Sequence, residues 1–73
     1  MSEEQLLRRA AEARASVERS QDYLAQRLHS TDQEQRAALK ALAIREMVSA
    51  RELLWFLIGD LERSQQQEEE DHT

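Results

Sequence analysis

Few residues in this sequence have the chemistry that a reactive site requires. Catalysis depends on polar side chains that converge in a pocket. Cysteine is absent, which excludes disulfides and thiolate metal ligands. The two histidines, His29 and His72, fall in a predicted turn and a predicted tail, and neither lies on an apolar helix face. Because the chain also has no glycine-rich phosphate loop, we expect no enzyme activity, no cofactor and no metal.

Arginines near the start of the chain could contact the phosphates of a nucleic acid. Residues 1–29 contain five of them, Arg8, Arg9, Arg14, Arg19 and Arg27, and also five acidic residues. The net charge of the whole chain is −5, and residues 65–73 supply −4 of it. Because nucleic-acid binding requires phosphate neutralisation, we expect solvated i,i+4 pairs such as Arg14–Glu18 rather than a binding face. An RNA-binding surface is the alternative.

The strongest candidate site is a stripe for binding a protein partner. Its members recur at alternating steps of four and three residues, which places them on one side of a helix. Tryptophan and arginine, two of its members, are enriched in interface hot spots. The candidate partner-binding residues are Ile44, Val48, Arg51, Trp55 and Ile58. The alternatives are a core role for Trp55 and an Arg51 stem that crosses the apolar surface to reach water.

A second stripe on the same helix is predicted to face the rest of the chain. It consists of Ala43, Met47, Ala50, Leu54, Leu57 and Leu61. Together the two stripes cover about half of the helix circumference, whereas one neighbouring helix covers about one heptad seam. The sequence therefore predicts a helix shared between the first helix and a partner, or a second copy of the chain.

The first helix is predicted over residues 2–29. Ser2 and Gln5 have the spacing of a capping box at its start. Its apolar seam contains small residues and so buries little area. The seam is Leu6, Ala10, Ala13, Val17, Ser20, Leu24 and Leu28.

A break at residues 29–32 separates this helix from a second one predicted over residues 32–64. Ser30 with Gln33, and Thr31 with Glu34, have capping-box spacing. A short connection between long helices favours an antiparallel pair. The predicted fold is all-α, a coiled-coil-like two-helix hairpin that completes a bundle with a partner or a second copy; one continuous helix is the alternative. Gly59, within the second predicted helix, indicates fraying or a close backbone approach. Residues 65–73 are predicted to be a disordered acidic tail.

The sequence also indicates a cytoplasmic location. The start, Met1-Ser2-Glu3-Glu4, is acidic where a signal peptide would be basic and then apolar. No apolar run approaches the length needed to cross a bilayer, so we expect no membrane partner.

Two short motifs carry a family resemblance. Glu3-Glu4-Gln5-Leu6 lies near the start of the first predicted helix, and Leu57-Ile58-Gly59-Asp60-Leu61 lies near the end of the second. In this respect the chain resembles the small E-component co-chaperones of type III secretion needle subunits, over most of residues 3–62. It departs from that family in lacking a glycine at the turn and in adding an acidic tail. The resemblance implies a helical-repeat chaperone as partner, and a role in keeping a needle subunit soluble before export.

A weaker resemblance leads to an alternative function. The short acidic turn Ser30-Thr31-Asp32-Gln33-Glu34 is similar to that of the Rop-like RNA-binding hairpins of plasmid copy control. This resemblance implies a homodimeric four-helix bundle with a regulatory role. A small regulatory or phage-type protein of another family is the third possibility.

Overall fold

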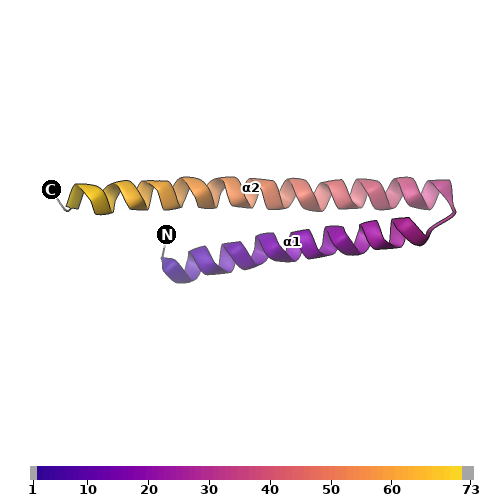
Figure 1. The fold of residues 1–73 in the computed structure, drawn as a ribbon, viewed down its shortest axis with the longest axis horizontal. Helices are drawn as coiled ribbons and strands as arrows, with labels where there is room; N and C mark the ends of the chain where they lie inside the picture. The colour runs from indigo at the N-terminus through magenta and orange to yellow at the C-terminus, as the bar shows by residue number, and fades with distance from the viewer. Residues whose placement is uncertain (1, 72–73) are drawn as a thin grey trace.

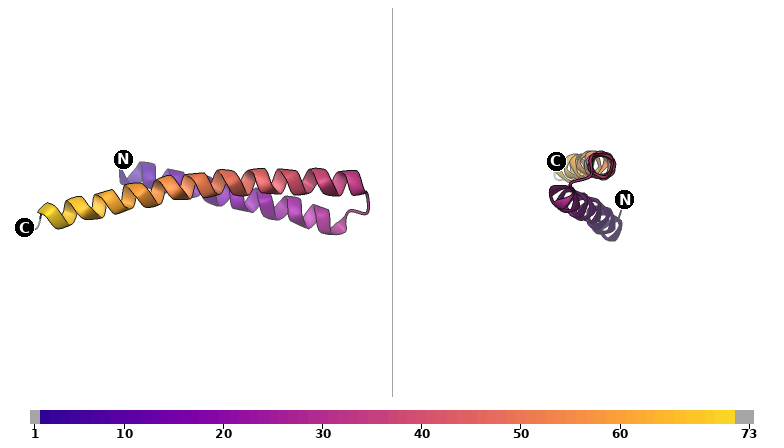
Figure 2. Two further views of the ribbon diagram at one scale, coloured as in Figure 1. Left: turned by 90° about the horizontal axis from the view of Figure 1, so that it is seen from above. Right: turned by 90° about the vertical axis from the view of Figure 1, so that its right-hand side faces the viewer.

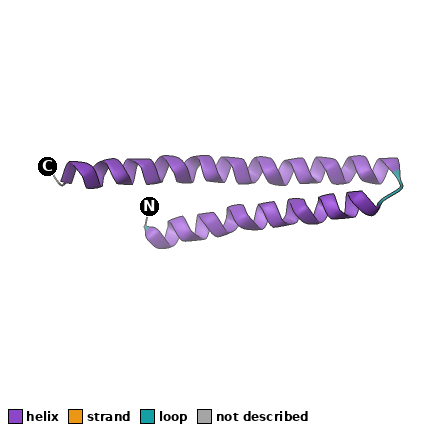
Figure 3. Cartoon of the chain, viewed as in Figure 1, coloured by secondary structure: helices purple, strands orange, loops and turns teal. Residues whose placement is uncertain are grey.

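The chain folds as an antiparallel hairpin of two long helices (Figure 1). The structure is a computed structural model that describes residues 2–71, with side chains described for residues 2–68. Helix α1 spans Glu3–His29 and helix α2 spans Gln33–Asp71. A connection of residues 30–32 joins them (Figure 3). The predicted all-α hairpin is confirmed, and its extents of 62 × 16 × 14 Å describe a rod.

The predicted capping box at the start of α1 is confirmed. The backbone N–H of Ser2 donates to Gln5 Oε1 at 3.0 Å, and the backbone N–H of Gln5 donates to Ser2 Oγ at 3.2 Å. These bonds satisfy groups that the first turn of a helix otherwise leaves unpaired. Glu3 and Glu4 follow in the first turn, where the helix dipole favours negative charge.

The two capping boxes predicted at the turn are wrong. Ser30 serves as the C-cap of α1 in extended conformation, and its hydroxyl lies 2.9 Å from Gln35 Oε1. The cap of α2 is Asp32, whose Oδ1 accepts from the backbone N–H of Glu34 at 3.1 Å. The described backbone has no residue at positive φ. The turn therefore forms without glycine.

Small residues form the seam between the helices. Its buried members are Ala13, Ser16 and Ser20 on α1, and Leu39, Ala43, Ala50 and Leu57 on α2. Their spacings are three and four residues on α1, and four, seven and seven residues on α2, which are those of a heptad seam. Because alanine and serine project little from the helix, the two backbones can approach closely along this line.

The seam differs from the predicted one on both helices. Leu6, Ala13 and Ser20 of the predicted α1 series are buried or half-buried, as are Ala43, Ala50 and Leu57 of the α2 series. Most of the bulkier members lie beside the seam and stay exposed, although Leu57 and Leu6 do not. The exposed ones are Val17, Leu24, Leu28, Met47, Leu54 and Leu61. Each helix is thus rotated from the predicted facing, and the smaller residues take the line of closest approach.

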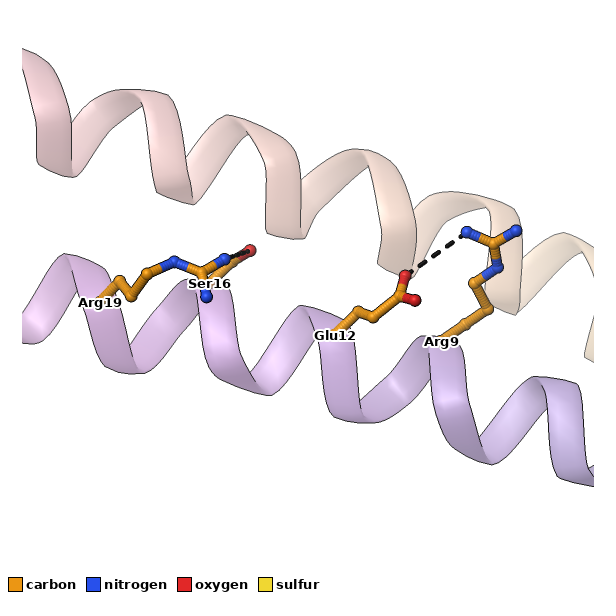
Figure 4. Close-up of polar contacts among 4 residues, drawn as sticks. All are labelled: Arg9, Glu12, Ser16 and Arg19. Atoms are coloured by element: carbon orange, nitrogen blue, oxygen red, sulfur yellow. Dashed lines mark hydrogen bonds and ion pairs between the residues drawn. The ribbon is translucent and has the colours of Figure 1, made fainter.

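The two buried serines of α1 have hydrogen-bond partners. Ser20 Oγ donates to the Val17 carbonyl oxygen at 2.6 Å, within the helix. Ser16 Oγ accepts from Arg19 Nη2 at 3.1 Å, as Figure 4 shows. Arg19 Nε also lies 3.1 Å from Glu46 Oε2 of α2. Arg19 therefore connects a buried hydroxyl on its own helix with a carboxylate on the other.

Helix α2 continues past its predicted end at residue 64. It runs to Asp71 and extends beyond the start of α1 (Figure 1). Residues 65–71 are thus helical where a disordered tail was predicted, while His72 and Thr73 lie outside the described residues. Glutamine and glutamate are good helix formers, and no proline or glycine interrupts this segment.

Gly59 lies within the continuous α2 helix. A Cβ atom built at this position would meet no atom within 4 Å. The close backbone approach inferred from this glycine is therefore wrong, and the position has open space beside it.

Candidate protein-interaction surface

The structure leaves the predicted partner-binding stripe uncovered. Ile44, Arg51, Trp55 and Ile58 are exposed, and Val48 is half-buried. Trp55 retains 71% of its accessible surface. All five residues come from α2, and none lies on the seam with α1. The core role that was the alternative for Trp55 therefore does not apply within this hairpin.

The uncovered apolar surface is wider than the predicted stripe. Met47 and Leu54, which were predicted to pack on α1, are 43% and 46% exposed. Val17 of α1 lines the same shallow hollow as Met47, Leu54, Trp55 and Ile58 of α2. We call this surface the open face and define it by its exposed apolar residues, which are Val17, Leu24, Ile44, Met47, Leu54, Trp55, Ile58 and Leu61.

Both helices contribute to the open face because they run antiparallel. Val17 and Leu24 each lie four residues after a seam residue of α1, Ala13 and Ser20. On α2, Met47 and Leu54 lie four residues after the seam residues Ala43 and Ala50. In an antiparallel pair, rows in equivalent positions lie on the same side of the seam. The two rows therefore merge into one surface, which sequence reasoning missed by assigning both rows to the seam.

The opposite side of the hairpin is more polar. A groove there is lined by Arg9, Glu12, Ser49, Glu52 and Asp60, together with apolar residues of α2. Arg9 Nη1 lies 3.4 Å from Glu12 Oε2 on α1, beside α2 (Figure 4). Phe56 lines this groove, and its ring packs edge-on against Trp55, with centroids 5.2 Å apart and an interplanar angle of 77°. The two sides of the hairpin thus differ clearly in chemistry.

Several arginines of α1 are already paired with carboxylates. Arg9 pairs with Glu12, Arg14 Nε lies 3.0 Å from Glu18 Oε1, and Arg19 pairs with Glu46. The predicted Arg14–Glu18 pair is confirmed. These pairs are largely exposed and each adds little stability. They do, however, place a negative group beside each of these three cations, which is unfavourable for phosphate binding.

Other kinds of site have little support in the described part of the chain. Among residues 2–71, no group of three or more histidine, aspartate or glutamate side chains could hold a metal ion. Over the same range, neither helix has a stretch that is both long and apolar enough to cross a bilayer.

Fold and surface together define an antiparallel helical hairpin with one open apolar face. Comparisons with protein-family models, with curated proteins and with solved structures find no match to this chain.

Proposed function

We propose that this chain is a non-enzymatic protein-interaction module that completes a helical bundle through its open face. The observation that carries this proposal is the exposure of large apolar side chains from both helices on one side of the rod. Each such residue contributes about 1.5–3 kcal/mol when it is fully buried. Contiguous apolar surface of this kind is typical of binding sites. Arg51, at the edge of the hollow, can pair with a carboxylate on the partner.

A more specific form of the proposal names the partner. The resemblance to the E-component co-chaperones suggests a cytoplasmic role, with a helical-repeat chaperone on the open face and a secretion needle subunit held by the pair. An exposed apolar side on a rod of two helices suits this role, because a concave helical-repeat surface can enclose such a rod. The two motifs of the resemblance also have roles inside the hairpin. Gln5 completes the α1 capping box, and Leu57 is buried in the seam.

Affinity capture from the native host tests this proposal. The tagged full chain is compared with Trp55→Ala on the stripe and with Leu42→Ala as control, an exposed leucine that is not part of the open face. Proteins retained by the chain and by the control, but lost with Trp55→Ala, are identified by mass spectrometry and titrated in purified form.

We expect Trp55→Ala to weaken binding by about 2 kcal/mol or more, as a central hot spot does. The co-chaperone form requires a helical-repeat chaperone and a needle subunit among these proteins. Equal retention by all three baits would contradict the proposal.

RNA binding provides a separate outcome. The Rop-like alternative requires a gel shift at physiological salt that Arg14→Ala or Arg19→Ala weakens. We expect no such shift, because both arginines already pair with carboxylates.

A further inference from the structure

We propose that the occupant of the open face is a second copy of this chain, stacked antiparallel to the first. This inference rests on the general form of the proposed function, an interaction module that acts through its open face, and it names a second copy in place of the helical-repeat chaperone. The result is a four-helix bundle in which the open faces of two hairpins form the shared core.

The accessible surface of the single chain is larger than that of a compact monomer of the same mass and can supply a dimer interface. It amounts to 6237 Å² for a chain of 8.5 kDa. A compact monomer of that mass exposes about 4,650 Å², so the excess is about 1,600 Å². A stable interface buries roughly 800 Å² on each partner. The hairpin thus has about twice the surplus surface that a stable dimer needs.

The reason for this surplus is that the hairpin is a single layer. The end-on view in Figure 2 shows the two helices side by side, with no third element across either face in the described chain. Stable domains generally consist of at least two packed layers around a common core. A second hairpin supplies the missing layer along the whole length of α1.

The distribution of charge favours the antiparallel arrangement of the two copies. The end with the two termini, residues 2–12 and 56–71, has nine acidic and three basic residues, a net charge of −6. The end with the turn, residues 24–42, has three basic and two acidic residues, a net charge of +1. The segments between them are neutral. A parallel stack would bring two ends of −6 together, whereas an antiparallel stack places each acidic end beside the turn of the other copy.

The same distribution allows the hairpin to complement itself, which supports a second copy as the occupant. An antiparallel stack of two identical rods is related by a two-fold axis, so one face must complement itself. The neutral middle of the rod, where Met47 and Leu54 lie, meets its own equivalent across that axis. Each acidic end then lies beside the turn of the other copy, whose net charge is +1, and away from the other acidic end.

Sedimentation equilibrium tests the second copy. We expect the full chain to have twice its sequence mass at micromolar concentrations. Leu54→Glu places an unpaired charge in the shared core and is expected to raise the dissociation constant by about 30-fold or more. The matched control is Leu42→Glu, at a leucine that is not part of the open face. The exposed fractions are similar, 39% for Leu42 and 46% for Leu54. It should leave the mass unchanged, and circular dichroism verifies that each variant is helical.

A distance measurement tests the orientation. Because the chain has no cysteine, Thr31→Cys introduces a single site for a spin label at the turn. In the antiparallel dimer the two labels lie at opposite ends, separated by about 40 Å, the length of a 27-residue helix. This measurement also decides the matter if Leu54→Glu unfolds the chain, since Thr31 lies away from the seam.

Three results would overturn the inference. They are a monomeric full chain, a dimer that survives Leu54→Glu in a helical protein, and a short distance between the two Thr31 labels. A monomer that loses a host protein on Trp55→Ala would refute the second copy and leave the proposed function standing. A chain that neither dimerises nor binds any protein through the open face would refute both.

Discussion

Arg36 Nη1 lies 2.6 Å from the carbonyl oxygen of Arg27 and 3.2 Å from that of Ser30. The side chain of one helix thereby caps the carboxyl end of the other. The last carbonyls of a helix have no partner within it and carry partial negative charge, so a guanidinium is well suited to them. This contact holds the first turn of α2 against the last turn of α1 and complements the Asp32 cap.

Arg36→Ala should lower the free energy of unfolding by about 1.5–3 kcal/mol, the usual contribution of hydrogen bonds to a charged group. The control is Arg45→Ala, at an exposed arginine on the same helix, which should change stability by less than about 0.5 kcal/mol. Urea denaturation followed by circular dichroism gives both values. Equal effects of the two variants would show that the contact at the turn adds no stability.

Leu57→Ala should destabilise the hairpin far more than Leu54→Ala does in the monomer. Leu57 is 6% exposed on the seam, whereas Leu54 is 46% exposed on the open face. Truncation of a buried leucine costs about 2–5 kcal/mol, which is a large share of the stability of a small protein. Thermal unfolding of both variants on a Met47→Glu background, which places a charge on the open face to prevent self-association, measures the difference. A Leu54→Ala effect as large as that of Leu57→Ala would mean that the seam is assigned wrongly.

The fold could be predicted from the sequence because its signals are local. The Ser2 capping box, the apolar spacing and the polar break after His29 each depend on residues that are close together in the chain. The rotation of the helices could not be predicted in this way. Met47 and Ala43 are both apolar and lie on adjacent rows, so periodicity alone does not tell which row meets α1. The structure places Ala43 there, because the small residues of both helices allow the closest approach.

The exposure of most of the candidate stripe could also be predicted from local periodicity. Ile44, Arg51, Trp55 and Ile58 are exposed as the stripe requires, since a helix that is apolar over half its circumference cannot hide all of it against one neighbour. The contribution of α1 through Val17 was missed, because it depends on which rows of the two helices lie on the same side. What covers the surface depends on how a second molecule is placed against it, which the periodicity of one helix does not indicate.

Ser20 should tolerate alanine but not leucine. Its side chain is 2% exposed and lies among small seam residues. Ser20→Ala removes a hydroxyl that bonds only to the helix backbone, and alanine has a higher helix propensity than serine. The free energy of unfolding should therefore change by less than about 0.5 kcal/mol or rise slightly. Ser20→Leu forces the helices apart and should cost about 1–3 kcal/mol. Chemical denaturation of both variants tests this, and a neutral Ser20→Leu would indicate a loose seam.

Gly59→Ala should stabilise the chain. The position is helical, its φ is not positive, and an added Cβ meets open space. Alanine is favoured over glycine in a helix interior by about 0.8–1.0 kcal/mol. The melting temperature of the variant should rise accordingly, with Ser49→Ala as a control of smaller effect on the same helix. A fall in melting temperature would reveal that Gly59 makes a contact in the assembled protein.

The three-residue turn also has a consequence for how the hairpin forms. Arg27 and Arg36, beside the turn, are only nine positions apart, whereas Leu6 and Leu57 of the seam are separated by 51 positions. Because the entropy lost in closing a loop increases with its length, pairing near the turn is the least costly first step. The two helices should therefore pair first beside the Asp32 cap, and the pairing should then extend toward the termini. Amide hydrogens near the acidic end, the last part to close, should be the first to exchange when the protein opens.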